Sequence, residues 1–202
     1  MGVNVRRVRT QRQIYRAAGK LLTTMPYDKL RTSQIAEEAL ISRSGFYLYF
    51  SDKDAMVTAY LEFLMDEIRE IRSKHYGSID ELNKALFQIV ELLHDEELFA
   101  ALISDKSSLE VISIIHTWMR SIVINYLVSY CQVVGVEFES LDNQMEYYVD
   151  VMVESFIAIF TRWFQRRKFE TVEEVTNILH DVLLSFMSIA PLKIGNKTSS
   201  VV

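Results

Sequence analysis

The sequence predicts an all-α protein of about nine helices. Its 202 residues include only 6 Gly and 2 Pro, too few turn-forming residues for a fold built from many short strands. Half of the residues are hydrophobic, so the chain can bury a substantial core and is not disordered. Apolar residues recur at helical spacing along most of the chain, which is the main sequence signal for amphipathic helices.

Charge is divided unevenly along the chain. The net charge is −5, which by itself argues against binding to nucleic acid. Residues 1–53, however, carry a formal charge of +6, and the remainder carries −11. A basic segment joined to an acidic one is typical of a small nucleic-acid-binding domain attached to a second domain. We therefore predict one domain over residues 1–53 and another over 54–190, connected by a helix at about 52–74, with a flexible tail at 191–202.

Two short helices separated by a tight turn are predicted within the basic domain, after a first helix at about 9–24. The earlier of the two covers about 32–39, and the turn falls at Leu40 and Ile41. Ser42 is expected to cap the next helix, because its hydroxyl can accept a bond from a free first-turn N–H. In that helix, residues 43–50, Phe46, Tyr49 and Phe50 have the spacing of a buried face.

The other face of this helix carries groups suited to DNA. Arg43, Ser44 and Tyr47 fall together on a second side, and guanidinium and phenol groups there can contact phosphates and base edges. Gly45 costs helix stability, so we attribute it to close approach of a partner. Lys53 lies in the first turn of the next helix, where the macrodipole disfavours a cation, and a phosphate contact would explain it.

This stretch resembles the N-terminal helix-turn-helix domain of TetR/AcrR-type transcriptional regulators, without a gap from about Arg9 to Tyr60. The matching residues are Tyr27, Ile35-Ala36, Ala39, Ile41-Ser42-Arg43, Phe46-Tyr47, Tyr49-Phe50 and Lys53. The resemblance implies that residues 43–50 form the recognition helix on double-stranded, palindromic operator DNA. It also implies phosphate contacts from Tyr47, Tyr49 and Lys53, and contacts near the start of the preceding helix from Thr32 and Ser33.

The chain departs from the family pattern at four positions. Leu40 stands in the turn where the family usually has Gly, and Arg31 stands where it often has a Thr or Ser cap. Ser44 and Gly45 stand where the recognition helix often has Gly then Thr. We expect Leu40 to strain the turn, and the other departures bear on which operator sequence is read.

Beyond the connecting helix, five more helices are predicted, at about 78–94, 96–104, 109–132, 141–167 and 171–189. The last two are apolar on more than one face, which calls for a second surface to cover them. A four-helix interface between two copies of the chain would provide it, and the resemblance implies the same homodimer. The alternative is one larger core within a single chain. The residues expected at the interface are Phe156, Phe160, Val175, Leu179, Val182 and Phe186.

A small-molecule effector site is the remaining functional expectation. In the resembled family the C-terminal domain binds a ligand among its helices, and this releases the protein from DNA. Polar and aromatic residues embedded in apolar runs are typical of such sites, although any core contains some of them. The expected lining is His116, Trp118, Asn125, Tyr126, Tyr147, Phe160 and Trp163.

The sequence offers no sign of catalysis or of a metal site. It contains no Gly-rich phosphate loop, HExxH or GxSxG motif, and its four His residues are scattered. The single Cys131 forms no CxxC pair and is expected to pack in the core. The apolar run at 111–136 is interrupted by Arg120 and other polar residues, so we expect no membrane span.

We therefore predict a cytoplasmic, homodimeric, ligand-responsive repressor that is not an enzyme and holds no metal or cofactor. The alternative is a helical interaction protein that has kept the N-terminal domain but no longer reads DNA.

Overall fold

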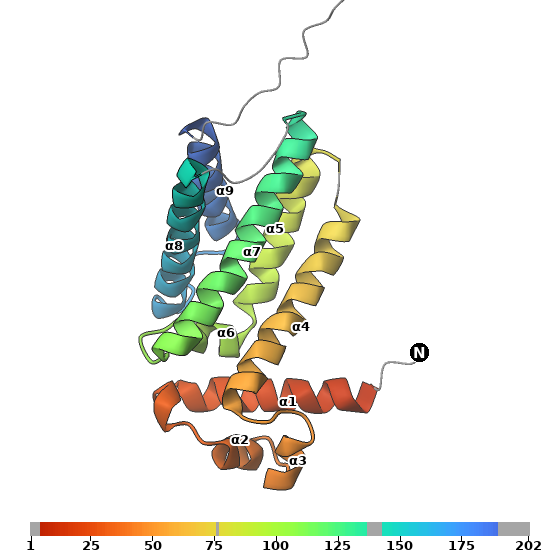
Figure 1. Ribbon diagram of the computed structural model, residues 1–202, viewed down its shortest axis with the longest axis vertical. Coiled ribbons are helices and arrows are strands. Elements are labelled where there is room, and N and C mark those ends of the chain that lie inside the picture. Colours follow the sequence, from red (N-terminus) through yellow and green to blue (C-terminus); the bar gives the residue numbers. More distant parts are fainter. Residues whose placement is uncertain (1–4, 76, 137–142, 190–202) are drawn as a thin grey trace, which may run out of the picture.

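The computed structural model describes residues 5–75, 77–136 and 143–189, and every regular element in these ranges is helical. Nine α-helices and one short 3-10 helix are present among these described residues, which confirms the all-α prediction. Figure 1 shows two parts: a tall bundle of helices, and a small group of helices across its base. The expected tail at 191–202 lies outside the described residues.

The helices at the base come first in the chain. Figure 1 shows α1 lying across the end of the bundle, with α2 and α3 on the opposite side of α1 from the bundle. Their shared core contains Ile14, Ala18, Ile35 and Phe46, each almost fully buried. The elements are α1 (Val5–Leu22), the 3-10 helix η1 (Tyr27–Lys29), α2 (Thr32–Glu38) and α3 (Arg43–Tyr47).

Two of these helices differ from the predicted boundaries. α1 begins at Val5, four residues before the predicted start, so the basic residues at the N-terminus are helical. α3 ends at Tyr47, three residues before the predicted end. The N–H groups of Leu48 and Tyr49 bond to carbonyls only three residues back, at 3.3 and 2.9 Å, which tightens the chain into a turn.

α4 (Lys53–Lys74) follows the base helices in the chain, with bounds close to those of the helix predicted at about 52–74. Asp52 caps it, because its carboxylate accepts from the Ala55 N–H at 2.7 Å. Figure 1 shows the helix rising from beside α1 and running along one side of the bundle. In the bundle, the Trp118 indole donates to the Leu61 carbonyl at 2.9 Å and so ties α4 to α7.

The bundle is completed by five helices close to the predicted ones. Three of them begin at hydroxyl caps, which are Ser78 for α5, Ser108 for α7 and Thr171 for α9. At Thr171 the capping box is reciprocal, since Glu174 also accepts from the Thr171 N–H at 2.8 Å. The helices are α5 (Ile79–His94), α6 (Glu97–Leu102), α7 (Leu109–Val134), α8 (Asn143–Gln165) and α9 (Val172–Ile189).

α7 is the central helix of the bundle and packs on α4, α5, α6 and α8. By length and composition alone it is apolar enough to cross a membrane, and it is the one such helix among the described residues. In this fold it is a core helix instead, with Val111, Ile115, Val123 and Leu127 buried. Its polar side pairs with α8, where Arg120 contacts two carboxylates, and Cys131 is buried as predicted.

α6 joins the bundle to the base. Gly19 of α1 faces its first residues so closely that a Cβ atom there would lie 2.8 Å from the Leu98 backbone nitrogen. Beside this contact, the buried Tyr60 hydroxyl donates to Glu96 at 2.9 Å and accepts from the Phe99 N–H at 3.1 Å. The domain boundary predicted at residue 53 stays a prediction. α1 of the base packs on α6 of the bundle, and α4, which begins at the base, packs on α5 and α7, so contacts cross between the two parts.

Candidate nucleic-acid interface and interior cavity

The turn between α2 and α3 places the start of α3 at the surface. Leu40 has a left-handed backbone (φ 56°) and a side chain that is 93% exposed. A non-glycine residue in this conformation is strained, as expected from the departure at this position. Ser42 then accepts from the Gly45 N–H at 2.9 Å, which confirms it as the cap of α3.

The exposed side of α3 forms one polar face with the start of α2. Arg43 and Ser44 are exposed, and the Tyr47 hydroxyl lies 3.1 Å from the Thr32 hydroxyl. The Arg43 guanidinium is 5.8 Å from the Tyr47 ring centroid. Hydrogen bonds from Thr32 and then from Arg43 lower the pKa of the Tyr47 phenol. Four residues expected at DNA are thus brought together.

Ser33 and Tyr49 extend this face, and the structure adds a residue that the sequence reasoning missed. Ser33 is exposed beside Thr32, and Tyr49 is half-buried against Phe50. The Arg7 guanidinium lies 5.8 Å from the Tyr49 ring, because α1 already starts at Val5. The run of arginines before residue 10 was the only sequence signal for this contact.

The absence of a side chain at Gly45 can be explained by a contact within the chain, in addition to the expected close approach of a partner. A Cβ atom at this position would lie 3.1 Å from the Ser42 hydroxyl oxygen, which is already bonded to the Gly45 N–H. The cap and a side chain at residue 45 therefore compete for the same space. Close approach to DNA remains a prediction.

Lys53 has a clear structural partner. Its ammonium group donates to the Tyr27 carbonyl at 2.8 Å and lies 4.3 Å from the Tyr27 ring centroid. The Tyr27 hydroxyl donates in turn to Asp54 at 2.7 Å, and burial raises the pKa of this phenol. The bonds hold η1 to the start of α4, while two ammonium hydrogens stay available for a phosphate.

α2 begins without the usual Thr or Ser N-cap, because Arg31 occupies that position. Arg31 has no acceptor in its side chain, so it cannot take the role of a Thr or Ser there. The Gln34 side chain instead accepts from the Arg31 N–H at 2.9 Å. This leaves the guanidinium of Arg31 exposed beside the polar face.

A small apolar cavity lies inside the bundle. Its volume is about 30 Å³, room for about one water molecule, so the bundle is nearly closed. The wall comes mainly from α5, α7, α8 and α9, and Arg72 of α4 is the one charged residue in it. The Arg72 guanidinium donates to the Asn125 carbonyl at 3.1 Å and to the Ser129 hydroxyl at 2.8 Å, and burial lowers its pKa.

The predicted effector residues are only partly brought together. Tyr126 and Phe160 line the interior cavity, and burial raises the pKa of the Tyr126 phenol to about 12, which keeps it neutral. Asn125 and Tyr147 are exposed, so they do not face the interior. The remaining three have other neighbours: His116 contacts Glu154, the Trp118 indole bonds to α4, and the Trp163 indole donates to Glu170. Sequence reasoning missed Arg72, because a helical Arg amid charged neighbours carries no distinguishing signal.

The predicted interface residues lie mostly inside one chain. Phe156, Phe160, Val175 and Leu179 are at most 5% exposed, so their side chains cannot form a contact surface. Val182 and Phe186 are half-buried. α8 and α9 pack inward with these side chains because α5 and α7 cover them. The apolar residues that these two helices leave exposed are Tyr147, Val151, Ile178 and Leu184.

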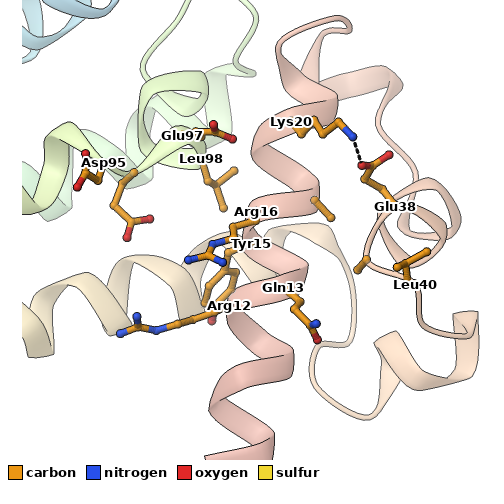
Figure 2. Close-up of a pocket in the computed structure, with 13 residues that line it drawn as sticks. Arg12, Gln13, Tyr15, Arg16, Lys20, Glu38, Leu40, Asp95, Glu97 and Leu98 are labelled. Atoms are coloured by element: carbon orange, nitrogen blue, oxygen red, sulfur yellow. Dashed lines mark hydrogen bonds and ion pairs between the residues drawn. The ribbon is translucent and has the colours of Figure 1, made fainter. Parts of the chain in front are cut away.

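An open cleft of about 540 Å³ flanks the contact between α1 and α6. Figure 2 shows Arg16 projecting from α1 toward the segment that carries Asp95 and Glu97, while Arg12 lies beside α4, where it pairs with Glu67 at 3.8 Å. On the other flank of α1, Lys20 is ion-paired with Glu38 of α2 (Figure 2). The cleft therefore places cations of the basic part opposite carboxylates of the acidic part.

The polar face lies within a segment that matches a known family. Residues 14–60 match the family described as bacterial regulatory proteins, tetR family. This match covers α2, α3 and the start of α4. A search of curated proteins found no match.

Solved structures of similar fold extend the likeness to most of the chain. The fatty acid degradation regulator FadR from Bacillus halodurans is 18% identical, with a TM-score of 0.66, over 87% of this chain and 94% of that one. FadR from Bacillus subtilis, solved with stearoyl-CoA, is 21% identical, with a TM-score of 0.63, over 86% and 97%. A tetR-family transcriptional regulator from Streptomyces coelicolor is 18% identical, with a TM-score of 0.61, over 94% and 83%.

The N-terminal match and the shared fold together carry the assignment. The chain thus carries an N-terminal segment that matches the tetR family of bacterial regulatory proteins, within a fold similar to that of solved regulators.

Proposed function

We propose that the protein is a ligand-responsive repressor that binds a palindromic operator as a homodimer in the bacterial cytoplasm. The observation that carries the proposal is the polar face shared by α2 and α3. Arg43, Ser44 and Gly45 approach base edges in the major groove, while Thr32, Ser33, Ser42, Tyr47, Tyr49 and Lys53 position the phosphate backbone.

The geometry of this face supports a role at DNA. Thr32 and Tyr47 are hydrogen-bonded to each other, so α2 and α3 present their hydroxyl groups as one unit. Arg7 beside Tyr49 adds a cation at the edge of the face. Acidic residues of the bundle lie beyond α1, which orients the basic end toward DNA.

The exposed apolar residues of α8 and α9 support a homodimer. Val151, Ile178 and Leu184 are between 41% and 50% exposed, so α8 and α9 leave apolar surface that a second copy of the chain would cover. Pairing this surface with its copy would make an isologous four-helix interface. Such a dimer places two recognition helices about 34–36 Å apart, or one turn of DNA.

The interior cavity supports an amphipathic effector. Its wall is apolar except for Arg72, Tyr126 and Ser129, which suits a long hydrocarbon chain that ends in an anionic group. The FadR from Bacillus subtilis was solved with stearoyl-CoA, a molecule of this class. Because the cavity is nearly closed, the effector must spread the helices, and we infer that this displaces α4 and α6 against α1.

DNA binding is tested by fluorescence anisotropy of the full chain with DNA from upstream of its own gene, at several salt concentrations. We expect sequence-selective binding. The logarithm of the association constant should fall linearly with the logarithm of the salt concentration. Binding that does not distinguish this DNA from random duplex would instead favour a helical interaction protein that no longer reads DNA.

The effector is tested with stearoyl-CoA and lauroyl-CoA added to the DNA complex. We expect release of the DNA by the chain but not by its Arg72→Met variant, in which the anionic group loses its partner. Arg69→Met is the matched control, since Arg69 is an exposed residue of the same helix, paired with Asp66. Equal responses from both variants would remove Arg72 from the effector site.

A further inference from the structure

A further open cleft lies outside the bundle, where the end of α1, α6 and the turn after α8 meet. Its volume is about 530 Å³, within the range of small-molecule sites. Figure 1 shows α2 and α3 on the opposite side of α1 from α6, so the cavity does not face the proposed DNA surface. Four cations line it, together with a single carboxylate from Glu97: Lys20, Lys106, Arg167 and Lys168.

The positive charge of this cleft is poorly neutralised. Lys20 is ion-paired with Glu38, on the side of α1 toward α2. Lys106 and Lys168 donate to the main-chain carbonyls of Thr23 and His94, which are neutral acceptors. Among the described residues, the ion pairs include none to Lys106, Arg167 or Lys168. The cleft is thus cationic, although the chain beyond residue 53 carries −11.

The backbone holds two of these cations in an unfavourable conformation. Arg167 and Lys168 are consecutive and both left-handed, with φ of 57° and 56°. Glycine usually takes this place after a helix, because an L side chain is strained there. The Lys168 N–H bonds to the Trp163 carbonyl at 2.9 Å, which closes α8 with a Schellman turn. A glycine would serve this turn at lower cost, so the turn does not explain the charges.

The floor of the cleft is apolar. Ala100 and Ala101 of α6 form part of it, and Phe164 of α8 stacks on Phe160 and Trp163 behind it. Cations from separate elements around such a floor fit a small molecule that carries more than one anionic group. Arginine and lysine together are the usual partners of phosphate oxygens.

We propose that this basic cleft binds a small phosphorylated molecule with at least two anionic groups. Arg167 and Lys106 hold its phosphates from separate elements. The site is separate from the interior cavity, which Arg72 and the apolar wall define. A bound molecule would touch α1, α6 and the turn after α8 together.

Calorimetric titration of the full chain with ADP, inorganic pyrophosphate, citrate and adenosine, in 150 mM salt as a starting condition of about physiological strength, tests the proposal. We expect saturable binding of ADP and pyrophosphate at one site per chain, and none of adenosine. Binding of citrate in preference to the phosphates would overturn the assignment to phosphate, and absence of saturable binding would overturn the site.

Two variants locate the binding. Arg167→Gly removes the charge and favours the left-handed backbone, so the chain should fold at least as well, and Lys106→Gln removes the facing cation. We expect each to weaken ADP binding by at least about tenfold, the loss of one charged hydrogen bond. Arg166→Gln is the matched control, because Arg166 is adjacent but paired with Glu170 outside the cleft.

The controls separate this proposal from its rivals. An equal loss in Arg166→Gln would mean that ADP responds only to surface charge, which would overturn the site. Loss of ADP binding in Arg72→Met with retention in Arg167→Gly would place the ligand in the interior cavity instead. Binding of ADP is measured without DNA, so its result does not depend on whether the protein is a repressor.

Discussion

Gly19 and Leu98 bring two helices into backbone contact: a Cβ atom at Gly19 would lie 2.8 Å from the Leu98 nitrogen. The obstacle is main chain at the start of α6, so it cannot move aside as a flexible side chain would. α1 packs on α2, which forms the polar face together with α3. α6 belongs to the bundle that encloses the interior cavity. The spacing of these two helices therefore sets how the two parts of the protein sit against each other.

Gly19→Ala is expected to destabilise the protein despite the better helix propensity of Ala. Overpacking costs about 1–3 kcal/mol, and the gain from Ala in a helix is about 1 kcal/mol. We expect a lower melting temperature, with a shift of about 2–4 °C for each kcal/mol. A higher melting temperature would mean that α1 and α6 can separate freely.

Leu40→Gly is expected to stabilise the turn between α2 and α3. The left-handed backbone of Leu40 costs about 1–2 kcal/mol of folding free energy, which Gly would avoid. Gly also makes the unfolded chain more flexible, and this offsets about 0.4–1 kcal/mol of the gain. The melting temperature should rise by a few degrees. Leu48→Gly is the matched control, since Leu48 is 77% exposed but has ordinary helical angles (φ −72°), and it should not stabilise. Equal effects of the two variants would show that removing an exposed Leu is what matters.

Arg43→Ala is expected to weaken operator binding by about 1–3 kcal/mol and to relax sequence selectivity, because a guanidinium reads base edges by paired hydrogen bonds. Anisotropy titrations with operator and with random duplex measure both effects. A loss of the same size on both DNAs would make Arg43 a phosphate contact.

Lys53→Ala is expected to weaken binding to every duplex and to reduce the salt slope by about 1, if its free ammonium hydrogens reach a phosphate. The bond to the Tyr27 carbonyl adds a structural effect, so the melting temperature must be measured on the same variant. Lys29→Ala, which removes an exposed lysine from η1, is the control. An unchanged slope with a lower melting temperature would limit Lys53 to its internal role.

Asp52→Asn is expected to change how stability depends on pH. The hydrogen bond from the Ala55 N–H, above all, holds the pKa of the Asp52 carboxyl below its usual range. The charged cap thus contributes stability above the unfolded pKa, near 3.9, and loses it as pH falls through the lower folded value. The stability difference between the chain and Asp52→Asn, measured by urea unfolding, should shrink over this acidic window. Asp105→Asn, an exposed loop variant, serves as the control, and a difference that stays constant with pH would contradict the prediction.

The sequence by itself determined the local features of this protein. The cap at Ser42 and the turn at Leu40 depend on residues within a few positions of one another, and both were predicted. The helices of the bundle followed from apolar periodicity, and the family followed from the residues of the turn and α3.

Only the tertiary structure decided which faces point inward. α8 and α9 are apolar on several sides, so periodicity did not separate the interior side chains of Phe156 and Leu179 from the exposed ones of Val151 and Ile178. The contact of Gly19 with Leu98, the place of Arg72 in the cavity wall and the gathering of Lys20, Lys106 and Arg167 join residues far apart in the chain. Such proximity leaves no mark on local sequence, because it arises only when the helices pack.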